Sequence, residues 1–262
     1  MSKIIAIGGG ENGRVLPNGS KKEYETFAID KEIVSLTNKE NPHFLFLVHA
    51  QPDSKESQES YFQTMKKIYS EKFNCICQDL KTSELSNDKV IKEKIEWADI
   101  IYEGGGDTDK MISLWKKTGF DKILYKAWQE GKVISGISAG AVCWFNSCNS
   151  DSANEQNTKF CSVPCLNWIG IYLTPHCNET GRYESSIQEL KKNNLIGIML
   201  SNCSAIEIVD NKYRIITSPS KKVKEPYAIK AYWLNGSYYE EKISINEKYE
   251  SLDKLLEKNI TK

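Results

Sequence analysis

The sequence has no excess of one charge, no long apolar run and no paired cysteine knuckles. Its 262 residues carry 35 basic and 35 acidic side chains, whereas a nucleic-acid-binding surface would need a basic excess. No run of about 18 apolar residues occurs, so we expect no membrane span. The first residues are too short and too glycine-bounded for a secretion signal, and we therefore expect a cytoplasmic protein.

Eight cysteines are present, but no C-x-x-C spacing typical of a zinc site occurs among them. Cys161 and Cys165 are spaced C-x-x-x-C and could hold a metal together with Cys148 or Cys177. Buried thiols that stay reduced are the better interpretation for a cytoplasmic chain. We therefore expect no metal and no other cofactor.

Apolar runs of strand length alternate with segments of helical period. This alternation predicts an α/β fold, with a mainly parallel, flavodoxin-like central sheet and helices on both faces. In such sheets the ligand sits at the C-terminal strand ends. The expected strands are residues 3–7, 43–48, 74–80, 99–103, the run ending at Val133-Ile134, 166–173 and 195–200, and the polar residues 149–164 are expected to form a loop.

The pattern changes after about residue 210. Ala228–Leu234 and Ser237–Tyr239 flank Asn235-Gly236, which is a strong type I′ hairpin signal. The length fits one large α/β domain or two small ones. We expect a single α/β domain over residues 1–262, in which residues 211–262 form an antiparallel extension.

The segment Gly136-Ile137-Ser138-Ala139-Gly140 follows a buried apolar run and precedes an apolar, helix-compatible segment from Ala141 to Phe145. Strand, G-x-S-x-G and helix form the context of a nucleophile elbow. Glycines beside Ser138 leave room for a sharp, strained turn. The segment therefore indicates Ser138 as a nucleophile, and a plain strand–helix connection is the alternative.

A nucleophilic serine needs a base, and the sequence offers only three histidines. His43 opens a strand at the far end of the sheet from Ser138. His49 ends the second strand at the same edge as Ser138 and is a rival. His176 also ends a strand, and Ser…acid…His is the chain order used with this elbow. We therefore expect His176 to be the base.

The base needs an acid that fixes its tautomer. Asp151 lies between Ser138 and His176 in the loop 149–164, from which it could curl back, and we take it as the acid. Glu155 in the same loop and Glu179 are the alternatives.

Two further groups complete the expected site. The backbone amides of Gly106 and Ala139 would form an oxyanion hole. Arg182 follows the histidine by six residues at an expected helix start, where it could hold a substrate carboxylate bidentately, although a solvated surface cation is the simpler explanation.

Four motifs occur in one order along the chain. They are Ile7-Gly8-Gly9-Gly10-Glu11, Gly104-Gly105-Gly106-Asp107-Thr108, Gly136-Ile137-Ser138-Ala139-Gly140-Ala141 and Pro175-His176. Together they resemble the peptidase E family of serine aspartyl dipeptidases, and the resemblance covers roughly residues 3–210. That family is related to the cyanophycinases, and its fold is similar to the class I glutamine amidotransferases, with serine in place of cysteine.

The resemblance implies a cytoplasmic, metal-free enzyme that cleaves dipeptides with an N-terminal aspartate. It implies Ser138 as nucleophile, His176 as base, and Gly106 and Ala139 as oxyanion donors. Thr180–Glu184 is similar to the family segment whose arginine holds the aspartyl side chain, which favours Arg182.

One residue departs from the family pattern. Asp107 stands where the family usually has asparagine, and its carboxylate would meet an acidic substrate. A catalytically silent or sensory binding protein therefore stays as an alternative, as does a cyanophycinase-like hydrolase of other aspartyl amide bonds. A cysteine amidotransferase is disfavoured because no cysteine occupies the elbow. We expect a small peptide as partner, and a monomer or homodimer.

Overall fold

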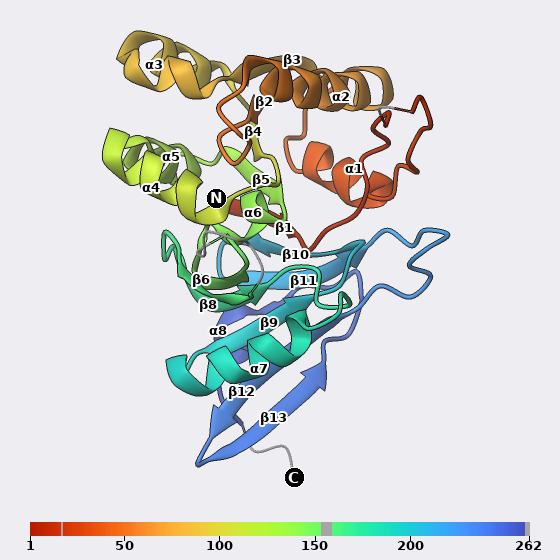
Figure 1. Cartoon of the computed structure of the whole chain (residues 1–262), viewed down its shortest axis with the longest axis vertical. Coiled ribbons are helices and arrows are strands. Elements are labelled where there is room, and N and C mark those ends of the chain that lie inside the picture. The colour runs from red at the N-terminus through yellow and green to blue at the C-terminus, as the bar shows by residue number, and fades with distance from the viewer. Residues whose placement is uncertain (17, 153–158, 260–262) are drawn as a thin grey trace.

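Two mixed sheets form the centre of the protein in a computed structural model that describes residues 1–16, 18–152 and 159–259 (Figure 1). The first sheet has the order β14-β11-β10-β1-β5-β4-β2-β3, and its β1, β5, β4, β2 and β3 are parallel. Its strands are β1 (Lys3–Ile7), β2 (His43–Leu47), β3 (Ile76–Leu80), β4 (Ile100–Glu103), β5 (Val133–Ile137), β10 (Ser204–Val209), β11 (Lys212–Thr217) and β14 (Glu250–Ser251).

The second sheet has the order β13-β12-β9-β8-β6-β7, with β6, β8 and β9 parallel. Its strands are β6 (Phe145–Ser150), β7 (Cys161–Pro164), β8 (Ile169–Thr174), β9 (Ile196–Leu200), β12 (Ala228–Leu234) and β13 (Ser237–Lys242). The α/β class expected from the sequence is therefore correct. The strands expected at 166–173 and 195–200 lie in this second sheet, as β8 and β9.

Helices cover both faces of the first sheet because its central strands are apolar on both sides. Ile5 and Ile7 of β1 pack with α1 and α2, whereas Ile4 and Ala6 pack with α3, α4 and α5. The helices and helical turns are α1 (Phe27–Ser35), α2 (Lys55–Phe73), η1 (Thr82–Ser86), α3 (Asp88–Trp97), α4 (Thr108–Thr118), α5 (Phe120–Gln129), α6 (Ala139–Val142), α7 (Arg182–Asn193) and α8 (Leu252–Leu255).

Two local expectations were wrong after Ser138. The helix ends at Val142, and the chain enters β6 at Phe145, where a continued helix was expected. Part of the expected loop 149–164 is strand, because β6 runs to Ser150 and β7 pairs antiparallel with it. Polar strand residues misled the prediction: Asn149 is fully buried, and its amide donates a hydrogen bond to the Ser185 hydroxyl.

The C-terminal part adds to both sheets. The hairpin expected at Asn235-Gly236 is confirmed, with positive φ at both residues and β12 paired with β13. β11 extends the first sheet, whereas β12 and β13 extend the second. Residues 211–262 thus contribute strands to both sheets. No helix in the described part of the chain is both long and apolar enough to cross a membrane.

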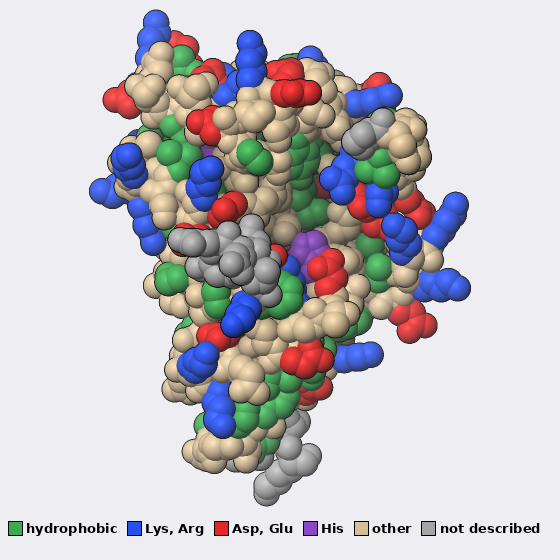
Figure 2. Space-filling model, in the orientation of Figure 1, with side chains coloured by type: hydrophobic (Ala, Val, Ile, Leu, Met, Phe, Trp, Pro, Cys, Tyr) green, Lys and Arg blue, Asp and Glu red, His purple; other side chains and the backbone are tan. Residues whose placement is uncertain are grey.

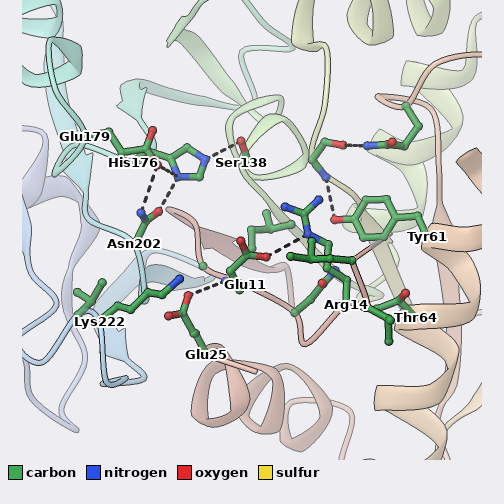
Figure 3. Close-up of a pocket in the computed structure, with 18 of the residues that line it drawn as sticks. Glu11, Arg14, Glu25, Tyr61, Thr64, Ser138, His176, Glu179, Asn202 and Lys222 are labelled. Carbon is green, nitrogen blue, oxygen red and sulfur yellow. Dashed lines mark hydrogen bonds and ion pairs between the residues drawn. The ribbon is translucent and has the colours of Figure 1, made fainter. Parts of the chain in front are cut away.

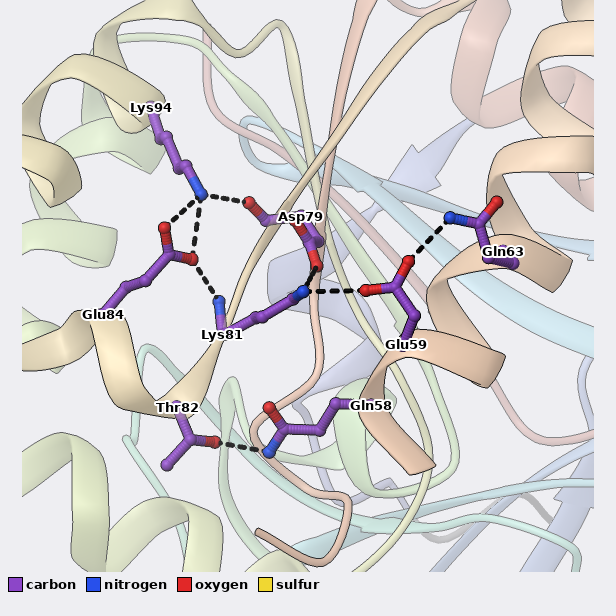
Figure 4. A network of polar contacts seen from close by, with 8 residues as sticks. All are labelled: Gln58, Glu59, Gln63, Asp79, Lys81, Thr82, Glu84 and Lys94. Atoms are coloured by element: carbon purple, nitrogen blue, oxygen red, sulfur yellow. Dashed lines mark hydrogen bonds and ion pairs between the residues drawn. The ribbon is translucent and has the colours of Figure 1, made fainter. Parts of the chain in front are cut away.

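Ion pairs hold the edge strand β3 to its neighbouring helices (Figure 4). Lys81, just after β3, contacts Glu59 of α2 at 2.7 Å, and Lys94 of α3 bonds to the Asp79 carbonyl and to Glu84. Charged side chains at this edge also discourage pairing with another chain.

Candidate active site

Ser138 lies in a strained turn between β5 and α6. Its φ of 56° and ψ of −115° are unusual for a residue with a Cβ. The Ser138 N–H donates to the Ile7 carbonyl at 3.1 Å, which ties the turn to the end of β1. The strand–turn–helix context expected from the sequence is therefore present.

Glycines are required on both sides of this turn. A Cβ on Gly136 would lie 2.3 Å from the Gly140 carbonyl oxygen, and one on Gly140 would lie 2.1 Å from the Glu103 carbonyl oxygen. Neither position has room for a side chain. The two glycines let α6 begin directly against the ends of β4 and β5.

His176 follows β8 and meets Ser138 across the boundary between the sheets. Its Nε2 lies 2.8 Å from the Ser138 Oγ (Figure 3). The His176 backbone is also in the left-handed region, with φ of 51°, and its N–H donates to the Gly8 carbonyl at 2.8 Å. The structure therefore brings together the two residues that the sequence paired.

The other ring nitrogen of His176 contacts Asn202, just after β9. The His176 Nδ1 lies 2.5 Å from the Asn202 Oδ1 and 3.4 Å from the Glu179 Oε1. Asn202 in turn donates its Nδ2 to the same Glu179 oxygen at 3.3 Å. This second bond orients the amide so that its oxygen faces the ring. We therefore assign the proton to Nδ1, which leaves Nε2 to accept from Ser138.

Asp151 does not take the position expected for the acid. Asn202 and Glu179 stand at Nδ1, and Asp151 acts on His176 through its charge, which raises the pKa of the imidazole. Glu155 lies outside the described residues. Sequence reasoning missed Asn202. Its signal in the sequence was its place soon after the expected strand 195–200, but only the structure shows that this strand runs parallel to the one before His176.

Burial dominates the electrostatics of the base. It lowers the pKa of His176 below the ordinary histidine value, while the charge of Glu179 opposes this shift. The imidazole is therefore neutral near neutral pH, as a proton acceptor must be.

The glycine turn after β1 packs against this pair. A Cβ on Gly9 would lie 2.1 Å from the Asn202 Oδ1 and 2.2 Å from the His176 Nδ1. The φ of 153° at Gly9 also favours glycine. The Gly-rich turn in the sequence thus serves as a flat support for the histidine.

The turn after β4 lies against Ser138 on its other side. A Cβ on Gly105 would lie 3.4 Å from the Ser138 Cβ. The Gly105 N–H donates to the Tyr61 hydroxyl at 3.2 Å, and its carbonyl accepts from the Gln51 amide. The expected oxyanion donors, Gly106 and Ala139, are next in sequence to Gly105 and Ser138.

A cavity of about 760 Å³ opens beside Ser138 and His176. Hydroxyls of α2 line it, together with the charged side chains of Glu11, Arg14 and Lys222. In the space-filling view a histidine shows near the centre of the drawn face, with acidic and basic side chains around it (Figure 2). The volume suits a small ligand.

Two expected substrate-binding residues are not among the described residues that line this cavity. Arg182 is 8 % exposed, donates to the Asn149 carbonyl at 3.2 Å and stacks on the Phe160 ring. Asp107 caps α4 by accepting from the Lys110 N–H at 2.9 Å. Both residues therefore have structural partners, and a role of either one in substrate binding stays a prediction.

The rival histidines are accounted for elsewhere. His43 stacks on Trp97 at the opposite end of β2. His49 is buried beneath the β4 turn, where its Nδ1 accepts from the Trp115 indole at 2.9 Å and lies 3.7 Å from Glu103. Burial lowers the pKa of His49 to about 3 and raises that of Glu103 to about 8.

A strained serine hydroxyl bonded to a neutral imidazole, on an α/β fold, is the arrangement of a hydrolase that acts through an activated serine. The family model of peptidase family S51 matches residues 14–216. The chain therefore belongs to peptidase family S51, and it is a peptidase.

Relatives agree with this assignment. The uncharacterized peptidase YgaJ of Bacillus subtilis is 28 % identical over 84 % of this chain and 89 % of its own length. The crystal structure of a peptidase from an acI-B1 Actinobacterium has a TM-score of 0.69 at 16 % identity, covering 96 % of this chain and 97 % of that one. A Listeria monocytogenes protein described as a candidate peptidase E has a TM-score of 0.57 at 18 % identity, covering 83 % of this chain and 98 % of that one. At these identities the solved structures show the fold alone.

We predict that Gly9→Ala disables the site while the protein stays folded. The new methyl group would displace the His176–Asn202 pair, and a displacement of about 1 Å can slow catalysis roughly 100-fold. A fluorophosphonate, which reacts with activated serine hydroxyls, measures the loss. The matched control is Gly19→Ala, because Gly19 also has a positive φ but a Cβ there meets no atom within 4 Å. Equal labelling of the two variants would contradict the prediction.

We predict that Glu103→Gln changes how stability depends on pH. The folded state holds a proton on Glu103 up to about pH 8, whereas the unfolded chain releases it near the ordinary glutamate value. The free energy of unfolding of the wild type should therefore fall between about pH 5 and 8. In the glutamine variant this fall should be smaller by roughly 1 kcal/mol or more. Urea unfolding at the two pH values measures the difference, and parallel pH curves would refute it.

Proposed function

We propose that this peptidase is a serine-type exopeptidase that hydrolyses small peptides through Ser138. The 2.8 Å contact between the Ser138 Oγ and the His176 Nε2 carries the proposal. In the first step Ser138 attacks the peptide carbonyl and His176 takes the hydroxyl proton. His176 then gives this proton to the leaving amine. Water then attacks the acyl-enzyme while His176 takes its proton, and His176 returns this proton to the Ser138 oxygen as the acid leaves.

Asn202 takes the orienting role in this proposal. An amide oxygen at Nδ1 can hold the imidazole tautomer, although it stabilises imidazolium less than a carboxylate would. Glu179 supplies a negative charge near the ring, with its Oε1 3.4 Å from the His176 Nδ1. The proposed set is therefore Ser138, His176 and Asn202, with Glu179 behind them, and the amides of Gly106 and Ala139 as oxyanion donors.

The size and charge of the cavity support a short peptide substrate. Glu11 and Glu179 line it and could receive a free α-amino group, while Arg14 and Lys222 could receive a carboxylate. Arg14 is the more constrained of the two cations because it already pairs with Glu11 at 3.2 Å. Any dipeptide presents both charges, and the N-terminal aspartate of the proposed substrate rests on the resemblance to the peptidase E family.

The first prediction from this proposal concerns Ser138→Ala. A fluorophosphonate should label the wild type and leave Ser138→Ala unlabelled, because among the described residues Ser138 is the serine whose hydroxyl contacts a histidine. Ser70→Ala is the control, since the Ser70 hydroxyl bonds to the Lys66 carbonyl within α2 and should not affect labelling.

The same variants then test the substrate. Hydrolysis of Asp-X dipeptides that depends on Ser138 would support the exopeptidase, and cleavage of β-aspartyl amide bonds alone would instead support a cyanophycinase-like hydrolase. Equal labelling of the wild type and Ser138→Ala, together with ligand binding and no turnover, would leave the silent binding protein.

The second prediction concerns the pH dependence of labelling. The charge of Glu179 raises the pKa of His176, so Glu179→Gln should move the acid limb of the labelling rate to lower pH by roughly half a unit. Asn202→Asp places a carboxylate at Nδ1 and should move the same limb upward. Glu184→Gln, on the exposed side of α7, is the control and should leave it in place. Movement of the two limbs in the same direction would contradict the assigned arrangement around His176.

A further inference from the structure

The side chain of Gln51, in the loop after β2, holds the backbone of Gly105. Its Nε2 donates to the Gly105 carbonyl oxygen at 2.5 Å. Its Oε1 accepts from the Ser57 hydroxyl, in the first turn of α2, at 3.2 Å. The second bond orients the carboxamide, so that its nitrogen and not its oxygen faces Gly105.

Gly105 is also held from its other side. Its N–H donates to the Tyr61 hydroxyl at 3.2 Å, as Figure 3 shows for the labelled tyrosine. Gln51 and Tyr61 thus bind the carbonyl and the amide of the residue that lies against Ser138. Glycine backbone rotates more freely than that of other residues, so a glycine turn needs such partners to keep one conformation.

The orientation of the next amide follows from these bonds. No cis peptide occurs among the described residues, so the Gly106 N–H points opposite to the Gly105 carbonyl and therefore away from Gln51. In the described part of the chain no hydrogen-bond acceptor is assigned to that N–H. An oriented donor without a partner, next to a nucleophilic hydroxyl, is suited to receive negative charge.

The loop that carries Gln51 is itself anchored. The Ala50 N–H donates to the buried Glu103 carboxyl at 3.1 Å, and the Ala50 carbonyl accepts from the Asp107 N–H at 2.8 Å. The loops after β2 and β4 are therefore joined by backbone and by side chain. The backbone next to Gln51 is therefore held in place, which fixes the position from which its side chain bonds to Gly105.

From this geometry we infer that Gln51 is a positioning residue for the oxyanion hole. It sets the plane of the Gly105–Gly106 peptide and so aims the Gly106 amide at the oxygen that becomes negative when Ser138 attacks. The inference rests on the proposed serine chemistry. It adds a polar side chain from the β2 loop to a site otherwise built from the turns after β1, β4, β5, β8 and β9.

The test compares Gln51→Ala with Gln63→Ala, an exposed glutamine on α2 outside the cavity. We expect fluorophosphonate labelling of Ser138 to slow about 10-fold or more in Gln51→Ala, because a mis-aimed amide stabilises the developing charge poorly. Gln63→Ala should label at the wild-type rate, and thermal melting should show both variants folded. A folded Gln51→Ala that labels at the wild-type rate overturns the inference.

Gln51→Glu separates positioning from a loss of packing. A glutamate keeps the shape, but it can donate to the Gly105 carbonyl only when it is protonated. The labelling rate of Gln51→Glu relative to wild type should therefore rise as pH falls towards the pKa of the new carboxyl. A ratio that stays constant with pH would refute the role.

The proposed serine chemistry fails by a different result. If the wild type is not labelled, or Ser138→Ala is labelled equally, then the nucleophile is wrong and the assignment of Gln51 falls with it. If labelling requires Ser138 but its rate is the same in Gln51→Ala and the wild type, only the positioning role is wrong.

Discussion

Three hydrogen bonds to the end of β1 hold the candidate site together. The carbonyls of Ile7, Gly8 and Gly9 accept the backbone N–H groups of Ser138, His176 and Cys203, at 3.1, 2.8 and 2.8 Å. Each bond fixes a turn that carries one member of the site, since Asn202 directly precedes Cys203. A single glycine turn therefore sets the spacing of the hydroxyl, the imidazole and the amide.

This constraint explains why the site lies between two sheets. Ser138 and the glycine turn after β4 come from the first sheet, whereas His176 and Asn202 come from the second. β1 lies within the first sheet, between β10 and β5, and its C-terminal turn reaches the second. The strained backbone at Ser138 and His176 is held by these contacts on both sides.

The surroundings of His176 balance two opposing effects. Burial favours the neutral ring, which can accept a proton, and the nearby charges of Glu179 and Asp151 favour the protonated ring, which must form during the reaction. A neutral amide at Nδ1 keeps the tautomer without adding a charge at that position. The pKa of His176 is thus set by several groups at different distances and not by one carboxylate.

Local patterns were enough to predict much of this arrangement. Buried strands were visible as apolar runs, the type I′ hairpin as Asn235-Gly236, and the strained turn as glycines around Ser138, because these features depend on neighbours in the chain. The place of His176 at the end of an expected strand, together with the Ser…acid…His chain order, also indicated it as the base. These parts of the fold and site needed no knowledge of distant contacts.

Long-range pairing decided the rest. The sequence by itself determined the α/β class, the serine turn and the short choice among three histidines. Only the tertiary structure decided that β8 joins a second sheet, that Asn202 and Glu179 face His176 in place of Asp151, and that Arg182 contacts the Asn149 carbonyl while Asp107 caps α4. The physical reason is that each of these contacts joins residues whose meeting depends on strand pairing and helix packing, which no local pattern records.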